Sequence, residues 1–283
     1  MKVIACIPAR YSSTRFPAKV LAKDTGKFLI QHTYERACLA KLPEKVIIAA
    51  DDEKVVKAAK SFGAECILTS VEHESGTDRI AEAVADIDVD IVVNLQADEP
   101  EIDPKNIDYL AQLLIDNPDY PMATLAAEFK NAEQIADPNI VKVIVSPCIS
   151  SAALGAGMRD ASCGRQMMDE GRGTRDKIGR AIYFSRAPIP YDREKAGIGN
   201  VRQYLRHIGI YAYRKEFLLN ITALPQTLLE KTEKLEQLRA IENGFAILVG
   251  KAKHTCDGID TPEQYAAFVK RCKIATESTE KNR

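Results

Sequence analysis

The feature that most constrains the fold is an alternation of two kinds of segment through the first half of the chain. Short apolar runs rich in β-branched residues are separated by segments with helical periodicity. This alternation is typical of a mostly parallel sheet covered by helices, because parallel strands need long crossover connections. The expected strands span 3–7, 45–50, 65–69 and 90–95, and the expected helices span 28–40, 53–62 and 78–85. We therefore expect an α/β protein.

The second half is less regular. Strand-like runs at 122–129, 141–145, 181–185 and 208–213 indicate antiparallel additions or a small subdomain, and a helix at 228–243, a strand at 245–249 and a helix from 261 to about 272 follow. The segment 146–179 has little periodicity and is expected to be a loop-like insertion, either a lid or a surface excursion. We expect one domain over 1–283, with a frayed polar tail at 273–283.

Composition excludes several classes of protein. The chain of 283 residues can bury a sizeable core, and its formal charge of -1 gives no general signal for nucleic acid or an anionic membrane. No run approaches the roughly 20 apolar residues that span a bilayer. Met1 and Lys2 lead directly into the first expected strand, with no signal-peptide pattern. We expect a cytoplasmic protein with no nucleic-acid or membrane partner.

Cysteine and histidine spacing argues against a zinc site. The seven cysteines are scattered and odd in number, and the four histidines contain no i, i+4 pair. Zinc sites and disulfide frameworks use closely paired ligands or an even set of thiols. The sequence therefore favours reduced thiols that serve as small apolar side chains.

A cationic loop follows the first expected strand. The run 7–19 reads IPARYSSTRFPAK, which places Arg10, Arg15 and Lys19 among hydroxyl side chains. Ligands of open α/β sheets bind beyond the carboxyl ends of strands, and Arg and Lys suit phosphate oxygens. The loop predicts a polyphosphate site, although a solvated surface loop would have the same composition.

Two separated carboxylates support the phosphate hypothesis. Asp98 follows the expected strand at 90–95, and a carboxylate beside phosphate implies a divalent cation, most simply Mg²⁺. Asp103 already serves as the cap before Pro104, so Asp98 has no evident capping duty. Asp260, in the run GIDTPE, suits either the start of the last helix or the same metal. Both interpretations of Asp260 can hold together.

A third loop at the same edge of the sheet reads HESGTDR at 73–79. Its hydroxyls and the backbone N–H groups ahead of a helix suit a nucleobase edge or an anionic group. Alone, this pattern is a weak signal.

Taken together, the ordered motifs resemble the 3-deoxy-manno-octulosonate cytidylyltransferases, also called CMP-Kdo synthetases. The similar segments are 7–19, HESGTDR at 73–79, QADEP at 96–100, RHIGIYAYR at 206–214, LEKTEKLEQLR within 229–239, and GIDTPE at 258–263. They recur in family order from residue 1 to about 270.

The resemblance implies an activity and a fold. The activity is transfer of CMP from CTP to the anomeric hydroxyl of Kdo, an acidic 3-deoxy sugar, with release of pyrophosphate, for lipopolysaccharide synthesis. The fold is of the nucleotidyltransferase type, Rossmann-like, with a mostly parallel central sheet, helices on both faces and a small antiparallel dimerisation subdomain. The resemblance also implies Mg²⁺ and a homodimer.

The resemblance further implies roles for particular residues. The implied catalytic residues are Lys19, Arg10, Asp98 and Asp260. Lys19 would offset charge on the reacting α-phosphate, Arg10 would help to hold the triphosphate, and the two aspartates would hold metal. The implied nucleotide-binding residues are Arg10, Ser13, Arg15, Lys19, Ser75 and Gln96, and the implied sugar-binding residues are Arg79, His207, Tyr211, Glu236 and Gln237. From the residues alone, His207 is as well explained by a structural role, and Tyr211 by core packing.

The chain departs from the family pattern at three positions. Ala18 and Ala97 stand where the family has glycine, and Val20 stands where it has proline. A methyl group would cost about 1 kcal/mol or more if the backbone there required a positive φ. The alternatives that remain open are a modified or different ulosonic acid acceptor, such as 8-amino-Kdo or sialic acid, and a non-catalytic CTP-binding regulator.

Overall fold

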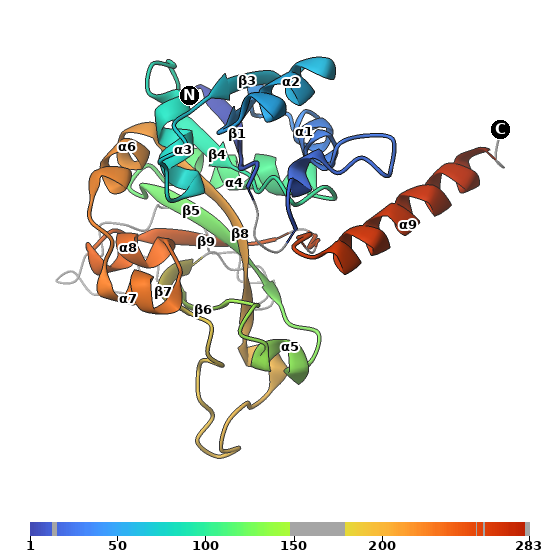
Figure 1. Cartoon of the computed structure of the whole chain (residues 1–283). Coiled ribbons are helices and arrows are strands. Elements are labelled where there is room, and N and C mark those ends of the chain that lie inside the picture. The colour runs from blue at the N-terminus through green and yellow to red at the C-terminus, as the bar shows by residue number, and fades with distance from the viewer. Residues whose placement is uncertain (13–15, 148–178, 253, 257, 281–283) are drawn as a thin grey trace. The chain divides into compact units, whose positions relative to one another are not determined.

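The computed structural model describes residues 1–12, 16–147, 179–252, 254–256 and 258–280. Figure 1 shows their helices and strands in chain order. The elements are β1 (Val3–Ala9), η1 (Lys19–Leu21), α1 (Leu29–Ala37), β2 (Lys45–Ala50), α2 (Glu53–Ser61), β3 (Glu65–Leu68), α3 (Gly76–Val84), β4 (Ile91–Asn94), α4 (Pro104–Asp116), β5 (Met122–Glu128), α5 (Ala132–Ala136), β6 (Lys142–Pro147), β7 (Gly179–Ser185), η3 (Val201–Gln203), β8 (Leu205–Arg214), α6 (Lys215–Ala223), α7 (Leu228–Glu233), α8 (Gln237–Glu242), β9 (Ile247–Lys251) and α9 (Pro262–Glu280).

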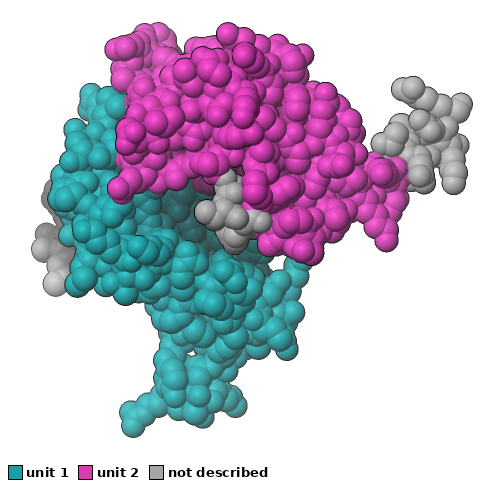
Figure 2. Space-filling model, viewed as in Figure 1, with its two compact units in different colours: residues 1, 90–93, 108–255 teal, residues 2–89, 94–107, 256–283 magenta. Residues whose placement is uncertain are grey.

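The chain divides into two compact units, which Figure 2 distinguishes by colour. Unit 1 contains residues 1, 90–93 and 108–255, and unit 2 contains residues 2–89, 94–107 and 256–283. The sequence analysis expects a single domain. Because each unit combines segments from distant parts of the chain, no linker or change of composition marks the division.

Unit 2 contains the parallel strands that the sequence predicts. β1 pairs with β2 and β2 with β3, and the register aligns Ala9 with Ala50 and Ala50 with Leu68. The carboxyl ends of these three strands therefore lie at one edge, which we call the rim of unit 2. Helices α1, α2 and α3 contact these strands. The capping pattern explains where two of them begin: Asp52 caps α2, and Ser75 caps α3.

Unit 1 contains the antiparallel strands. β5 lies between β9, to which it is parallel, and β8, to which it is antiparallel; β7 pairs antiparallel with both β6 and β9. A bulge interrupts the β5–β8 ladder at Thr124 and Leu125. The structure is thus α/β, with a sheet that contains both parallel and antiparallel strands. This confirms the expected fold class.

The predicted strands of the first half are present as β1 to β4, with ends shifted by two residues at most. Two other expectations were wrong. The single helix expected at 228–243 is two short helices, α7 and α8, because Lys234 adopts a left-handed backbone conformation with φ 54° between them. The last helix continues through Glu280, beyond the expected end at about residue 272.

Most of the expected insertion at 146–179 lies outside the described residues. Its two described ends are paired, since Pro147 of β6 aligns with Gly179 of β7. The segment therefore leaves and re-enters unit 1 at neighbouring positions. Among the described residues, none of the helices combines the length and the apolar character needed to cross a membrane.

Candidate functional site

Polar groups from several loops of unit 2 gather around the ammonium group of Lys19. The Nζ atom of Lys19 lies 2.7 Å from Oδ2 of Asp98, 3.2 Å from Oδ1 of Asp260 and 2.6 Å from the carbonyl oxygen of Ile259. We call these four residues the Lys19 cluster. The side chain of Lys19 is 11% exposed, whereas those of Asp98 and Asp260 are 27% and 43% exposed. The ammonium is thus enclosed, and the carboxylates remain open to solvent.

Asp98 reaches the cluster on the loop that follows β4. The hydroxyl of Thr33 in α1 donates to the carbonyl of Ala97 at 3.1 Å, and the backbone N–H of Ile259 donates to the carbonyl of Asp98 at 2.9 Å. The backbone on both sides of the Asp98 side chain is therefore anchored. As the sequence predicts, Asp103 caps the next helix, with its Oδ1 accepting from the N–H of Lys105 at 2.9 Å.

Asp260 reaches the cluster because an apolar group anchors the start of α9. Leu29, Ile259, Tyr265 and Phe268 form a buried cluster, against which Phe16 packs. The last helix is thereby attached beside the loop that carries Lys19.

Capping chemistry leaves the carboxylate of Asp260 available to Lys19. The side chain of Gln264 accepts from the backbone N–H groups of Asp260 and Thr261, and Thr261 Oγ1 accepts from the N–H of Gln264 at 3.3 Å. This is a capping box in which threonine, not the aspartate, supplies the cap. The capping interpretation of the GIDTPE motif therefore applies to Thr261, and the metal role of Asp260 stays a prediction.

Lys19 is presented by a short 3₁₀ helix that begins at a left-handed residue. Ala18 has φ 52° and ψ 27°, the conformation for which glycine is preferred. The methyl group of Ala18 therefore carries the cost that the sequence analysis anticipates. Ala97 is different, because it is absent from the described residues with positive φ and is 8% exposed.

The other predicted phosphate ligands lie along the rim of unit 2 or outside the described residues. Arg10 is exposed, and its guanidinium donates to the carbonyl of His73 at 3.0 Å, so the first loop contacts the loop before α3. Ser13 and Arg15 fall in the undescribed segment 13–15. Their roles stay predictions.

Ser75 and Gln96 lie in the loops that follow β3 and β4, and both residues belong to unit 2. Ser75 Oγ accepts from the N–H of Asp78 at 3.0 Å, and Asp78 accepts in return from the N–H of Ser75. The hydroxyl of Ser75 thus has a capping role in this structure. Gln96 is half-buried and precedes Asp98 by two residues. Nucleotide contact by either side chain stays a prediction.

Arg79 is buried beneath the rim. Its NH1 group donates to Thr69 Oγ1 at 2.6 Å and to the carbonyl of Ser70 at 3.1 Å, and its NH2 group lies 3.5 Å from Oδ2 of Asp51. Burial lowers the pKa of the guanidinium, and Asp51 opposes that shift. Arg79 therefore braces the loops that follow β2 and β3. Its predicted contact with sugar stays a prediction.

Asp51 is a functional candidate that the sequence analysis omitted. Its Oδ1 accepts from the backbone N–H of Tyr11 at 2.8 Å, so one carboxylate joins the cationic loop to Arg79. The signal was available, because Asp51 directly follows a strand whose end lies at the rim. The carbonyl of Ile259 was also omitted, and no sequence pattern identifies a backbone acceptor of this kind.

The remaining predicted sugar residues belong to unit 1. His207 on β8 is 8% exposed, and its ring contacts those of Phe184 and Tyr211 with centroids 4.9 and 5.5 Å apart. Its Nε2 lies 3.0 Å from Thr124 Oγ1, which also lies 2.8 Å from the carbonyl of Ile210. Nε2 of His207 and the hydroxyl of Thr124 therefore form a buried hydrogen bond.

Burial keeps the imidazole of His207 neutral. Desolvation lowers the pKa of His207 to about 3. A neutral ring can donate and accept hydrogen bonds, but it places no positive charge beside a sugar carboxylate. Glu236 and Gln237 lie together at the start of α8, where Gln237 is 6% exposed and its Nε2 has no partner among the described residues.

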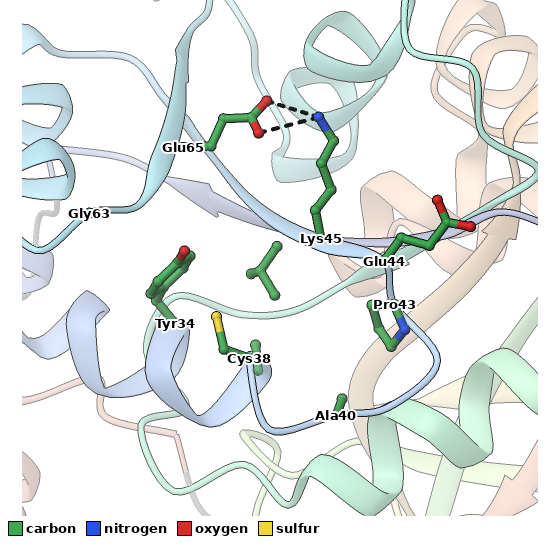
Figure 3. Close-up of a pocket in the computed structure, with 10 residues that line it drawn as sticks. Tyr34, Cys38, Ala40, Pro43, Glu44, Lys45, Gly63 and Glu65 are labelled. Carbon is green, nitrogen blue, oxygen red and sulfur yellow. Dashed lines mark hydrogen bonds and ion pairs between the residues drawn. The ribbon is translucent and has the colours of Figure 1, made fainter.

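A separate pocket of about 350 Å³ lies at the opposite end of the parallel strands of unit 2 (Figure 3). Lys45 and Glu65, the first residues of β2 and β3, form an ion pair across it at 3.0 Å. Burial raises the pKa of Tyr34 to about 12 and raises that of the Cys38 thiol. These groups stay protonated at neutral pH, so the pocket lacks an activated nucleophile.

Comparisons with known proteins assign the chain to a family. A family model described as Cytidylyltransferase matches residues 4–248. A 3-deoxy-manno-octulosonate cytidylyltransferase of Solibacter usitatus is 44% identical over 262 residues, which are 93% of this chain and 91% of that protein. The protein of the same name from Syntrophotalea carbinolica is 42% identical over 268 residues, covering 93% of this chain and 95% of its own.

A solved structure is similar over nearly the whole chain. It is described as CMP:2-keto-3-deoxy-manno-octonic acid synthetase complexed with CTP; it is 38% identical, with a TM-score of 0.78, and the match covers 98% of this chain and 100% of that one. The chain therefore belongs to the cytidylyltransferase family and, within it, to the 3-deoxy-manno-octulosonate cytidylyltransferases.

Proposed function

We propose that this protein transfers CMP from CTP to the anomeric hydroxyl of Kdo, releasing pyrophosphate and giving CMP-Kdo for lipopolysaccharide synthesis. The observation that carries the proposal is the Lys19 cluster, in which a cation from the loop after β1 meets carboxylates from the loop after β4 and from the start of α9. The names of the similar proteins supply the substrates. The same proposal includes a homodimer that acts in the cytoplasm, as the family resemblance implies.

The chemistry of the cluster fits Mg²⁺. Two carboxylates and a carbonyl already surround a cation, the Lys19 ammonium, and oxygen ligands are those that Mg²⁺ prefers. Among the described residues, no three or more Asp, Glu, His or Cys side chains are grouped so that they could hold a metal ion, so substrate oxygens and water would complete the ligand set. Asp98 and Asp260 would hold the ion, which would draw negative charge from the phosphates.

The residues of unit 2 act by binding and charge compensation. Attack on the α-phosphorus places negative charge on the non-bridging and pyrophosphate oxygens, and fixed cations that meet this charge lower the barrier. Lys19 and Arg10 are the described cations at the end of β1 that can do so, and the carbonyl of His73 orients the guanidinium of Arg10. Nucleotide binding also aligns the α-phosphate for in-line attack.

The residues of unit 1 are proposed to bind the acceptor sugar. The Nε2 of Gln237, which has no partner in the part of the chain that the structure describes, is a buried donor that suits a sugar hydroxyl or carboxylate. Tyr211 lies on β8 with its ring against His207, and the neutral imidazole of His207 suits hydrogen bonding better than charge pairing. Glu236, and Arg79 of unit 2, are proposed as sugar-binding residues on the family resemblance alone.

The direct test is pyrophosphate release from CTP in the presence of Mg²⁺ and Kdo. We expect turnover that depends on all three. Parallel reactions with 8-amino-Kdo and with sialic acid show whether a different ulosonic acid is preferred, since small differences in a pocket decide such choices. Tight CTP binding by calorimetry with no turnover on any of these acids would overturn the enzymatic assignment in favour of a nucleotide-binding regulator.

A further inference from the structure

We propose that the Lys19 ammonium is a built-in counterion of the metal site, which a divalent cation must displace before the site can work. The inference rests on the proposed function, in that Asp98 and Asp260 are taken as metal ligands. In this structure the ammonium has three acceptors, namely the two carboxylates and the carbonyl of Ile259, at 2.6 to 3.2 Å. An ammonium group has three N–H donors. None is left for a phosphate oxygen.

The charges of the cluster favour exchange over joint occupancy. With Lys19 in place, one positive charge faces two negative ones, so the ammonium offsets half of the charge of the two aspartates and reduces their mutual repulsion. A divalent ion added beside the ammonium would place cations together around the same carboxylate oxygens. Such repulsion is weakened little by solvent, because the Lys19 side chain is only 11% exposed.

Exchange requires motion of one side chain and not of the backbone. The N–H of Lys19 donates to the carbonyl of Phe16 at 3.2 Å, and the carbonyl of Lys19 accepts from the N–H of Ala22 at 3.1 Å. These bonds fix the Lys19 backbone, whereas its stem of four carbons is free to change rotamer. The open side of the cluster, formed by the more exposed carboxylates, is where a cation from solvent would enter.

The exchange would couple the metal to the catalytic lysine. A divalent ion that takes the carboxylates releases three N–H donors, and an incoming triphosphate offers oxygens to which Lys19 can donate. Without nucleotide, a divalent ion that binds the carboxylates leaves the enclosed Lys19 ammonium without hydrogen-bond acceptors, which costs free energy. Consequently the metal should bind weakly without nucleotide, and the metal–nucleotide pair should bind far more tightly than the metal alone.

The decisive experiment measures metal binding to the nucleotide-free protein. Mn²⁺ serves as the probe, and its free concentration is followed by electron paramagnetic resonance for wild type, K19M and K23M. Methionine retains the length of lysine without the charge, so K19M should bind Mn²⁺ at least about tenfold more tightly than wild type. Lys23 is the matched control: it is exposed, lies over the ring of Phe28 at 4.6 Å, and should leave Mn²⁺ affinity unchanged when replaced.

The opposite result overturns the inference. If K19M binds Mn²⁺ no more tightly than wild type, Lys19 and the metal do not compete, and the ammonium merely positions the carboxylates. The measurement involves neither nucleotide nor sugar. If the enzyme failed to turn over Kdo, the proposed function would be wrong, but the result for Mn²⁺ binding would be unaffected.

A measurement on the wild type covers the case in which K19M does not fold. In protein labelled with ¹⁵N-lysine, the enclosed ammonium of Lys19 should show slow proton exchange, with K19R used for assignment. Saturating Mg²⁺ should abolish this slow exchange. A Lys19 signal that is unchanged at saturating Mg²⁺ would contradict displacement.

Discussion

Lys19 in unit 2 and Lys142 in unit 1 both enclose an ammonium group among three oxygen acceptors, but the acceptors differ in charge. Lys142 donates to the carbonyls of Asp137, Ile140 and Arg186 at 3.0, 2.8 and 2.5 Å, and the residue is 0% exposed. Lys19 has two carboxylates among its acceptors, and these are partly open to solvent.

The difference separates a structural cation from an exchangeable one. Neutral carbonyls satisfy the N–H groups of Lys142 without compensating its charge, and burial lowers its pKa. Neutral carbonyls attract a competing cation less strongly than carboxylates do. The carboxylates around Lys19 attract any cation that reaches them. Enclosure of an amine is therefore insufficient to mark a functional site, and our proposal for Lys19 depends on the charge and exposure of its acceptors.

The largest effect is expected for D98N, which removes charge from the exchangeable cluster while keeping its shape. Asparagine can still accept from Lys19, so the free energy of unfolding should change by about 1 kcal/mol or less. CMP transfer should fall by at least about 100-fold, because charge compensation at the phosphates is lost. Steady-state pyrophosphate release and urea unfolding measure the two effects. Full activity in D98N would contradict a metal role for Asp98.

The complementary change is K142M, for which stability and activity should respond in the opposite way. Three carbonyls lose their donor, and the relieved burial of charge offsets only part of that loss, so we expect a destabilisation of about 2.5 kcal/mol. The rate of CMP transfer below the melting temperature should stay at the wild-type value. K130M, at an exposed lysine of the same unit, is the control and should change neither quantity. If K142M were as stable as wild type, Lys142 would not be a structural cation.

His207 extends the comparison to a buried base, whose Nε2 lies beside the hydroxyl of Thr124. Its pKa of about 3 lies below the value of about 6.5 for an exposed histidine. Between these two pH values, His207 is therefore protonated in the unfolded chain but not in the folded protein. The resulting stability is complete above pH 6.5 and is lost as the pH falls. From pH 7 to pH 5 the loss amounts to roughly 2 kcal/mol.

The variant H207Q isolates this contribution, because its amide can still donate to Thr124 but does not titrate. Urea unfolding at pH 7 and pH 5 should show a loss of stability that is roughly 2 kcal/mol smaller in H207Q than in wild type. His32, whose pKa burial also lowers, is present in both proteins, so its contribution cancels. Equal losses in the two proteins would show that His207 is protonated in the folded state.

Sequence reasoning located the exchangeable lysine better than the structural one. The rule that loops after parallel strands share an edge placed Lys19 and Asp98 in one region, since strand ends follow from apolar runs. Lys142 gave no signal, because its partners are backbone carbonyls, which carry no side-chain identity. The break at Lys234 was missed for a related reason, as a left-handed lysine interrupts a segment whose side-chain pattern continues.

The smallest expected effect concerns the backbone that presents Lys19, since Lys142 lies in a regular strand and Lys19 follows a left-handed alanine. In A18G the methyl group that disfavours φ 52° is removed, and the greater freedom of glycine in the unfolded chain opposes the gain. The net result should be a stabilisation of about 1 kcal/mol or less. Ala22, at the other end of the same short helix with φ -60°, supplies the control, because A22G should destabilise. If A18G lowered the urea midpoint as much as A22G does, the strain at Ala18 would be disproved, and the cluster would hold Lys19 in an unstrained turn.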